Sequence, residues 1–105
     1  MRPVGAGRQA GAPQIREKTE GETRSALAPP WNVIVHNDPI TLMTYVTMVL
    51  RKLFGYPQEK AQRLMMEVHT TGRSVVWTGA REQAEFYVQQ LHSYQLLATM
   101  EQVDE

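Results

Sequence analysis

The sequence predicts a single compact α+β domain in the order strand, helix, helix, strand, helix, strand. Two short apolar runs rich in β-branched residues alternate with segments of helical periodicity, and glycines follow two of those segments. Three strands with helices packed on one face form a compact antiparallel arrangement of this kind. A chain of 105 residues suffices for one domain and is short for two.

The first strand and first helix are predicted at 31–37 and 42–54. The run WNVIVHN is apolar and β-branched, and Asp38-Pro39 ends it. Thr41 is expected to cap the helix and Gly55 to close it. One apolar stripe at helical spacing is expected to face the core: Leu42, Val46, Val49, Leu50 and Leu53.

Pro57 suits the first turn of a second helix, where Glu59 complements the positive end and Gly72 ends the segment. Its inward face is predicted to hold Ala61, Leu64, Met65 and Val68. A strand is expected at 73–77, a turn at Thr78-Gly79, a third helix over 80–93 and a last strand over 96–102. The third helix is expected to bury Ala84, Tyr87, Val88 and Leu91.

The chain is predicted to divide into a disordered tail, residues 1–29, and a folded domain, residues 30–105. The tail is rich in Gly, Ala, Pro, Gln and charged residues, so it can bury little apolar area. It holds five basic and three acidic residues, against six and eight in the domain. The mildly acidic domain suits a cationic ligand better than a phosphate.

Composition excludes several classes of protein. The 11 basic residues equal the 11 acidic ones, so nothing points to nucleic acid, and no apolar run is long enough to span a membrane. The absence of cysteine excludes disulfides and thiolate sites, and the N-terminus lacks a secretory signal, so a cytoplasmic protein is expected. His36, His69 and His92 show no ligand spacing, so neither a metal nor a cofactor is expected.

Three polar residues can accept hydrogen bonds from a protonated α-amino group, a small cation with three N–H donors. Asn37 offers an amide oxygen, Asp38 a carboxylate and His69 a ring nitrogen. Capture of a chain end by such a cluster is a recurring recognition mode. The alternative is structural, because Asn-Asp-Pro often forms a plain turn and a helix histidine often only complements the helix dipole.

Apolar residues lie beside these acceptors on two predicted helix faces. Met65, Val68 and His69 share one face, and Met43 and Val46 share another. If the helices converge, these side chains can enclose a large unbranched or aromatic group, because flexible thioethers adapt to several shapes. The alternative is ordinary core packing, which we expect for Met48, Met66 and Met100.

Three segments together resemble the signature stretches of the ClpS adaptors of the Clp protease: VHNDPITLM at 35–43, LMMEVHTTGRS at 64–74 and LLATME at 96–101. The resemblance covers residues 31–101 and implies the same fold. It implies a non-enzymatic adaptor that binds N-degron substrates by a bulky first residue (Phe, Tyr, Trp or Leu). The implied substrate-binding residues are Asn37, Asp38, Thr41, Met43, Val46, Met65, Val68, His69 and Leu96.

The resemblance also implies a partner and one departure. The partner is the N-terminal domain of a Clp-family AAA+ unfoldase, of the ClpA or ClpC type, and Glu82 matches a residue that contacts it. A lysine that accompanies this residue in well-known members is Tyr87 here, and the tail resembles the family's N-terminal extension, used in delivery. Pro39 stands where many members carry a second aspartate.

Two other classes of function compete with an adaptor. A hydrolase or transferase needs a nucleophile and an oriented base, but Ser25 lies in the tail and Ser74 and Ser93 have no motif around them. A purely structural protein-interaction domain of this fold would have no affinity for free N-terminal residues.

Overall fold

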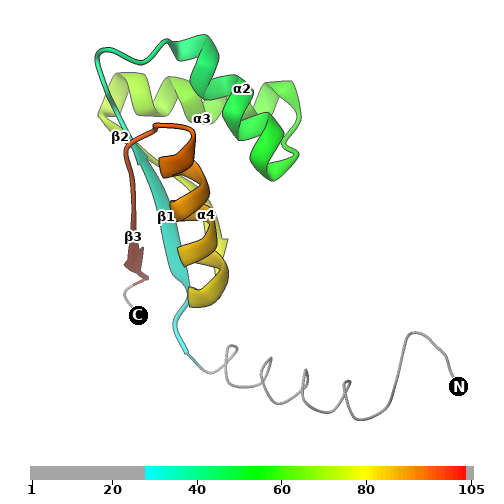
Figure 1. Ribbon diagram of the computed structural model, residues 1–105, viewed down its shortest axis with the longest axis vertical. Helices are drawn as coiled ribbons and strands as arrows, with labels where there is room; N and C mark the ends of the chain where they lie inside the picture. The colour runs from blue at the N-terminus through cyan, green and yellow to red at the C-terminus, as the bar shows by residue number, and fades with distance from the viewer. Residues whose placement is uncertain (1–27, 104–105) are drawn as a thin grey trace, which may run out of the picture.

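The structure is a computed structural model that describes residues 28–103 (Figure 1). All but the last two residues of the predicted tail, 1–29, lie outside this range. The elements are β1 (Trp31–His36), α2 (Met43–Phe54), α3 (Gln58–Thr71), β2 (Arg73–Gly79), α4 (Arg81–Ser93) and β3 (Ala98–Gln102). The predicted order and α+β class are therefore confirmed. No helix within residues 28–103 combines the length and the apolar character needed to cross a membrane.

The sheet has the order β2-β1-β3, and both neighbours run antiparallel to the central strand β1. In Figure 1, α4 runs along the sheet, whereas α2 and α3 lie together over the end at which β1 finishes. Val33 and Val35 of β1 pack into the core that the helices cover. The end of β1 thus meets the helix pair, and the candidate site lies there.

Ile34 is fully buried although it lies on the sheet face opposite the helix-side core. The register explains this burial. Arg73 of β2 pairs with His36 and Glu101 of β3 pairs with Asn32, so an ion pair between the two edge strands crosses β1 at Ile34. The Arg73 Nη2–Glu101 Oε1 distance is 3.2 Å. The arginine stem and the carboxylate thereby shield an apolar side chain from water.

A bulge interrupts the β1–β2 ladder. Val33 pairs with Trp77 and Ile34 with Val75, which leaves Val76 without a partner residue in β1. The Tyr56 hydroxyl donates to the Val76 carbonyl at 2.7 Å and so satisfies it. The α2–α3 connection is thus fastened to the sheet at the bulge.

Two of the predicted helix ends are confirmed. Gly55 and Gly72 adopt left-handed φ values of 73° and 95°, and their N–H groups bond back to the carbonyls of Arg51 and Val68. The predicted turn at Thr78-Gly79 is wrong, because both residues continue β2 opposite Asn32 and Trp31. A Cβ at Gly79 would lie 2.4 Å from the Trp77 ring, so any larger residue there would force that ring to move.

The predicted start of α2 is wrong by one residue. Leu42 is the N-cap and is 72% exposed, so it does not belong to the buried stripe. Thr41 does not cap the helix, because its hydroxyl donates to the Asp38 carboxylate instead. The last strand also starts later than predicted, at Ala98, because Leu96 bonds back to the Leu91 carbonyl and is held against the end of α4.

Most predicted core residues are confirmed. Val46, Val49, Leu50, Ala61, Leu64, Met65, Val68, Ala84 and Leu91 are buried, and Leu53, Tyr87, Val88 and Met100 are partly buried against them. The prediction that Met48 and Met66 pack inside is wrong, since they are 44% and 46% exposed. Periodicity favours neither of them, and no other signal in the sequence separates a surface methionine from a core one.

Tyr56 makes the fold sensitive to high pH. Burial, and then the neighbouring Tyr87, raise the pKa of Tyr56 above its ordinary value of 10.0. The folded state therefore holds the phenol proton more tightly than the unfolded chain. The stabilisation is fully present below about pH 10 and is lost as the pH rises through the folded pKa.

We expect Tyr56→Phe to lower the free energy of unfolding by about 0.5–1.5 kcal/mol at neutral pH, because the Val76 carbonyl loses its donor. Thermal melts of both proteins between pH 7 and pH 11 measure this. The gap between them should narrow above pH 10, where the unfolded wild-type chain loses its phenol proton while the folded protein still holds it. A gap that stays constant to pH 11 would contradict a role for this proton.

Candidate functional site

A small cavity opens where the end of β1 meets the helix pair. The structure brings all nine predicted substrate-binding residues to its wall. The β1–α2 loop supplies Asn37, Asp38 and Thr41; α2 supplies Met43 and Val46; α3 supplies Met65, Val68 and His69; and the α4–β3 connection supplies Leu96. Sequence positions up to 59 residues apart therefore meet at one place. Their role in binding stays a prediction.

The cavity has an apolar floor and a polar rim. Val46, Met65, Val68 and Leu96 are between 4% and 8% exposed and form the floor. Asn37 and His69 are exposed, and Asp38 is half-buried at the rim. Asp38 is the only carboxylate among the lining residues. Such a site suits a ligand with an apolar group at one end and a hydrogen-bonding cation at the other.

The backbone fixes the distance between the rim residues. The Asn37 N–H donates to the Gly72 carbonyl at 2.9 Å, so the loop after β1 is tied to the end of α3. His69 lies three residues before that carbonyl, within the last turn of α3. On the other side, the His36 N–H donates to the Leu97 carbonyl, also at 2.9 Å, and ties β1 to the connection that carries Leu96.

Asp38 organises its own loop. One carboxylate oxygen accepts the Ile40 N–H at 2.9 Å and the other accepts the Thr41 hydroxyl at 3.2 Å. The structural interpretation of Asn-Asp-Pro as a turn is thus correct for Asp38. It does not exclude a role in binding, because an ionised carboxylate has about four lone-pair sites and these bonds use two.

The cavity is nearly closed in this structure. Its volume is about 20 Å³, which is room for roughly one water molecule. An apolar side chain of any size can enter only if part of the wall moves. Met43 and Met65 are the flexible parts of that wall, since a thioether side chain has several rotatable bonds.

Sequence reasoning missed three lining residues: Val35, His36 and Leu97. Val35 and His36 directly precede Asn37 within the quoted motif, and this adjacency is the signal that could have found them. The His36 ring is engaged by the Thr99 hydroxyl, with 2.7 Å between Nε2 and Oγ1. Leu97 is 52% exposed. It reaches the cavity from the irregular connection between α4 and β3, which has no periodic pattern in the sequence.

Glu82 lies far from this cavity. It is exposed in the first turn of α4, whereas Leu96 follows the other end of that helix. The 13 residues of α4 separate the two regions by about 20 Å. Figure 1 shows the start of α4 at the end of the sheet remote from α2 and α3.

Tyr87 is the hub of an aromatic cluster. Its ring centroid lies 4.7 Å from that of Phe54, 4.9 Å from Trp77 and 5.5 Å from Phe86. Such contacts add stability beyond area burial. Tyr87 therefore joins α4 to α2 and β2 through apolar contact rather than presenting a charge.

The described residues contain little that resembles a catalytic centre. The Ser74 hydroxyl donates to the Glu67 carboxylate, and the Ser93 hydroxyl to the Gln90 carbonyl, so both serve structural acceptors. Across residues 28–103, no three His, Asp or Glu side chains gather where they could hold a metal ion.

Comparison with known proteins agrees with the fold and motifs. The family model described as the ATP-dependent Clp protease adaptor protein ClpS matches residues 26–102. The ClpS of Streptomyces coelicolor is 50% identical over 90 residues, covering 82% of this chain and 94% of that protein. The ClpS of Mycobacterium marinum is 52% identical over 83 residues, covering 79% and 82%.

A solved structure is also similar, that of Agrobacterium tumefaciens ClpS2 bound to L-phenylalaninamide. Its TM-score is 0.69 at 27% identity, with 72% of this chain and 99% of that chain covered. The fold and the matches together define a protease adaptor, not an enzyme. The chain belongs to the ClpS family of ATP-dependent Clp protease adaptors.

The Asp38–Thr41 bond generates a prediction. Thr41→Val keeps the side-chain shape but removes the hydroxyl donor, so it should lower the free energy of unfolding by about 0.5–1.5 kcal/mol. It should also speed hydrogen exchange at the Ile40 amide, because the carboxylate becomes free to rotate.

Thr70→Val is the matched control, because Thr70 donates only within α3, to the Met66 carbonyl. It should leave Ile40 exchange unchanged. Equal Ile40 exchange in wild type and Thr41→Val would show that the carboxylate holds the loop without the threonine.

Proposed function

We propose that this chain captures the N-terminal residue of N-degron proteins in the cavity at the end of β1. The preferred first residues are Phe, Tyr, Trp and Leu. The observation that carries the proposal is the arrangement of the cavity: an apolar floor for the side chain, with Asn37, Asp38 and His69 on the rim as acceptors for the α-ammonium group.

The likeness to Agrobacterium tumefaciens ClpS2 bound to L-phenylalaninamide supports this proposal. Phenylalaninamide carries a free amine, an aromatic side chain and an amide where the next peptide bond would begin. It therefore has the chemistry of a polypeptide that starts with phenylalanine. The apolar floor and polar rim in this chain suit the same combination of groups.

We further propose that the adaptor delivers its substrates, in the cytoplasm, to a Clp AAA+ unfoldase of the ClpA or ClpC type through a surface that includes Glu82. The distance of Glu82 from the cavity supports this role, because an unfoldase bound at Glu82 would leave the cavity open to the substrate. Phe86 and Tyr87 of the aromatic cluster lie on the same helix and would give that surface a less cationic character than a lysine would.

The first test compares two fluorescent peptides that both begin with Phe, one with a free amine and one acetylated. Acetylation removes the cation and should cost two or three bonds of about 1.5–3 kcal/mol each, so binding measured by anisotropy should weaken at least about 100-fold. Asn37→Ala should weaken binding of the free peptide, whereas Gln89→Ala, an exposed change on α4, should not. Equal binding of the two peptides would favour a structural interaction domain instead.

The second test separates delivery from capture. Glu82→Lys should slow unfoldase-dependent degradation of a reporter that begins with Phe, while leaving peptide binding unchanged. Glu59→Lys is the matched control, because Glu59 holds the same first-turn position in α3 and loses the same helix-dipole contact. If both variants slow degradation equally, Glu82 has no specific part in docking.

A further inference from the structure

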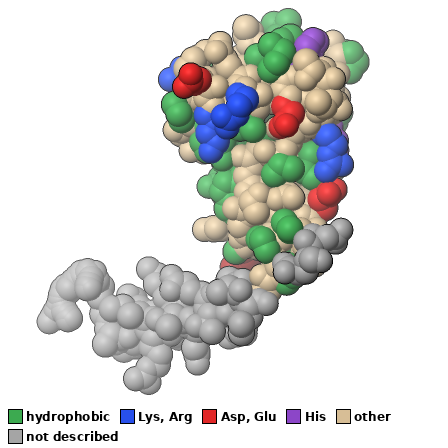
Figure 2. All heavy atoms as spheres, turned by 180° about the vertical axis from the view of Figure 1, so that it is seen from behind, with side chains coloured by type: hydrophobic (Ala, Val, Ile, Leu, Met, Phe, Trp, Pro, Cys, Tyr) green, Lys and Arg blue, Asp and Glu red, His purple; other side chains and the backbone are tan. Residues whose placement is uncertain are grey.

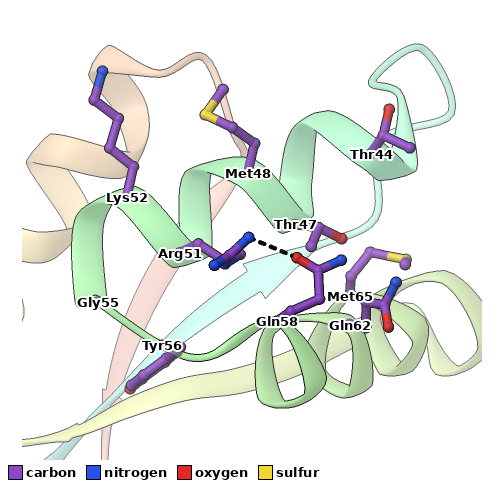
Figure 3. Close-up of a pocket in the computed structure, with 10 residues that line it drawn as sticks. All are labelled: Thr44, Thr47, Met48, Arg51, Lys52, Gly55, Tyr56, Gln58, Gln62 and Met65. Atoms are coloured by element: carbon purple, nitrogen blue, oxygen red, sulfur yellow. Dashed lines mark hydrogen bonds between the residues drawn. The ribbon is translucent and has the colours of Figure 1, made fainter.

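A second and larger hollow lies between α2 and α3, next to the cavity described above. Its volume is about 550 Å³. Figure 3 shows side chains of both helices around it, with Arg51 of α2 directed toward Gln58 of α3. Met48, one of the two methionines unexpectedly exposed, lines this groove.

The groove adjoins the first cavity. Met65 lines both hollows and forms the wall between them. Gln58, Gln62, Met65 and His69 follow one another at spacings of four, three and four residues, so they lie along one face of α3. Gln58 lies about 16 Å from His69 along the helix axis. A chain that starts at the rim and runs in extended form along α3 covers this distance with about five residues.

The groove has a positive character. Its lining residues include Arg51 and Lys52 but no acidic residue. Arg51 Nη1 donates to Gln58 Oε1 at 2.8 Å, a bond that reaches across the groove and uses one of the five guanidinium N–H donors. Figure 2 shows both Lys or Arg and Asp or Glu side chains over the part of the molecule that α2 and α3 form, so the positive character belongs to the lining of the groove and not to this whole surface.

The neighbouring charges preserve this character. Lys60 lies over the Tyr56 ring, 3.9 Å from its centroid, and adds a third cation close by. Glu59, beside Gln58, is exposed and does not line the groove. The positive end of the α3 dipole lies at Gln58 as well, because the helix begins there. Arg51 thus lies where an anionic side chain is favoured.

We propose that this groove receives the substrate segment that follows the captured first residue, and that it favours acidic side chains near the fifth position. The inference rests on the proposed function and adds a second determinant to it. Met48 and Met65 offer adaptable apolar contact, Gln58 and Gln62 offer amides to the substrate backbone, and Arg51 offers a planar donor for a carboxylate.

The test uses three peptides that share a free N-terminal Phe and differ only at positions 4 to 6, which hold Ala, Glu or Lys. The Glu peptide should bind about two- to fivefold more tightly than the Ala peptide for each carboxylate that reaches Arg51. The Lys peptide should bind more weakly than the Ala peptide. Raising the salt should reduce both differences, because exposed charges are screened.

Arg51→Glu should reverse this order, so that the Lys peptide binds best of the three. Arg63→Glu is the matched control, since Arg63 is exposed on α3 outside both hollows and makes the same change in net charge. It should leave the order unchanged. The inference is overturned if the three peptides bind alike, if Arg63→Glu shifts the order as strongly, or if an acetylated Glu peptide binds as well as the free one.

The Ala peptide separates the two proposals. If it binds and requires its free amine, the capture of N-terminal residues stands whatever the Glu and Lys peptides do. If it does not bind, the proposed function fails, and the proposal for the groove fails as well.

Discussion

The burial of β1 is the constraint on which the rest of this structure depends. β1 is the central strand, it pairs on both sides, and Val33, Ile34 and Val35 are all essentially inaccessible to water. Two faces must therefore be covered at once. Helices cover one face, and an ion pair between the edge strands covers the other at Ile34. The end of β1 at His36 fixes where the β1–α2 loop begins, and therefore where its polar residues lie.

The position of the candidate site follows from the path of the chain directly after β1. The chain turns at Asn37 and Asp38 and is fastened to α3 through Gly72 and to the α4–β3 connection through Leu97. These bonds involve backbone atoms, so they leave the Asn37 side chain free for a ligand. Asp38 differs, because its carboxylate already holds Ile40 and Thr41. Asp38 thus stabilises the turn and also lines the rim of the cavity, so the structural and the binding interpretations of Asn-Asp-Pro are compatible.

The sequence predicts local features well where one residue type has one physical reason to be there. Gly55 and Gly72 are examples, since only a left-handed residue ends these helices. The turn predicted at Gly79 is wrong because this glycine has a tertiary reason: the Trp77 ring, as it lies here, leaves no room for a Cβ. The cap predicted at Thr41 is wrong because the Asp38 carboxylate accepts its hydroxyl. The nine site residues could be proposed only through the family resemblance, since spacing alone allowed both core packing and a cavity. The groove could not be predicted, because it depends on how α2 and α3 face each other.

The small volume of the cavity has an energetic consequence under the proposed function. Any inserted side chain must first displace the thioethers of Met43 and Met65, and the open state has a free-energy cost that every ligand bears equally. A leucine or phenylalanine recovers about 1.5–3 kcal/mol by burial, whereas an alanine or serine recovers far less. Small first residues would thus be rejected, because the little surface that they bury cannot offset the cost of opening the cavity. Discrimination of this kind works as an energetic threshold: selectivity for bulk arises from the free energy needed to open the cavity.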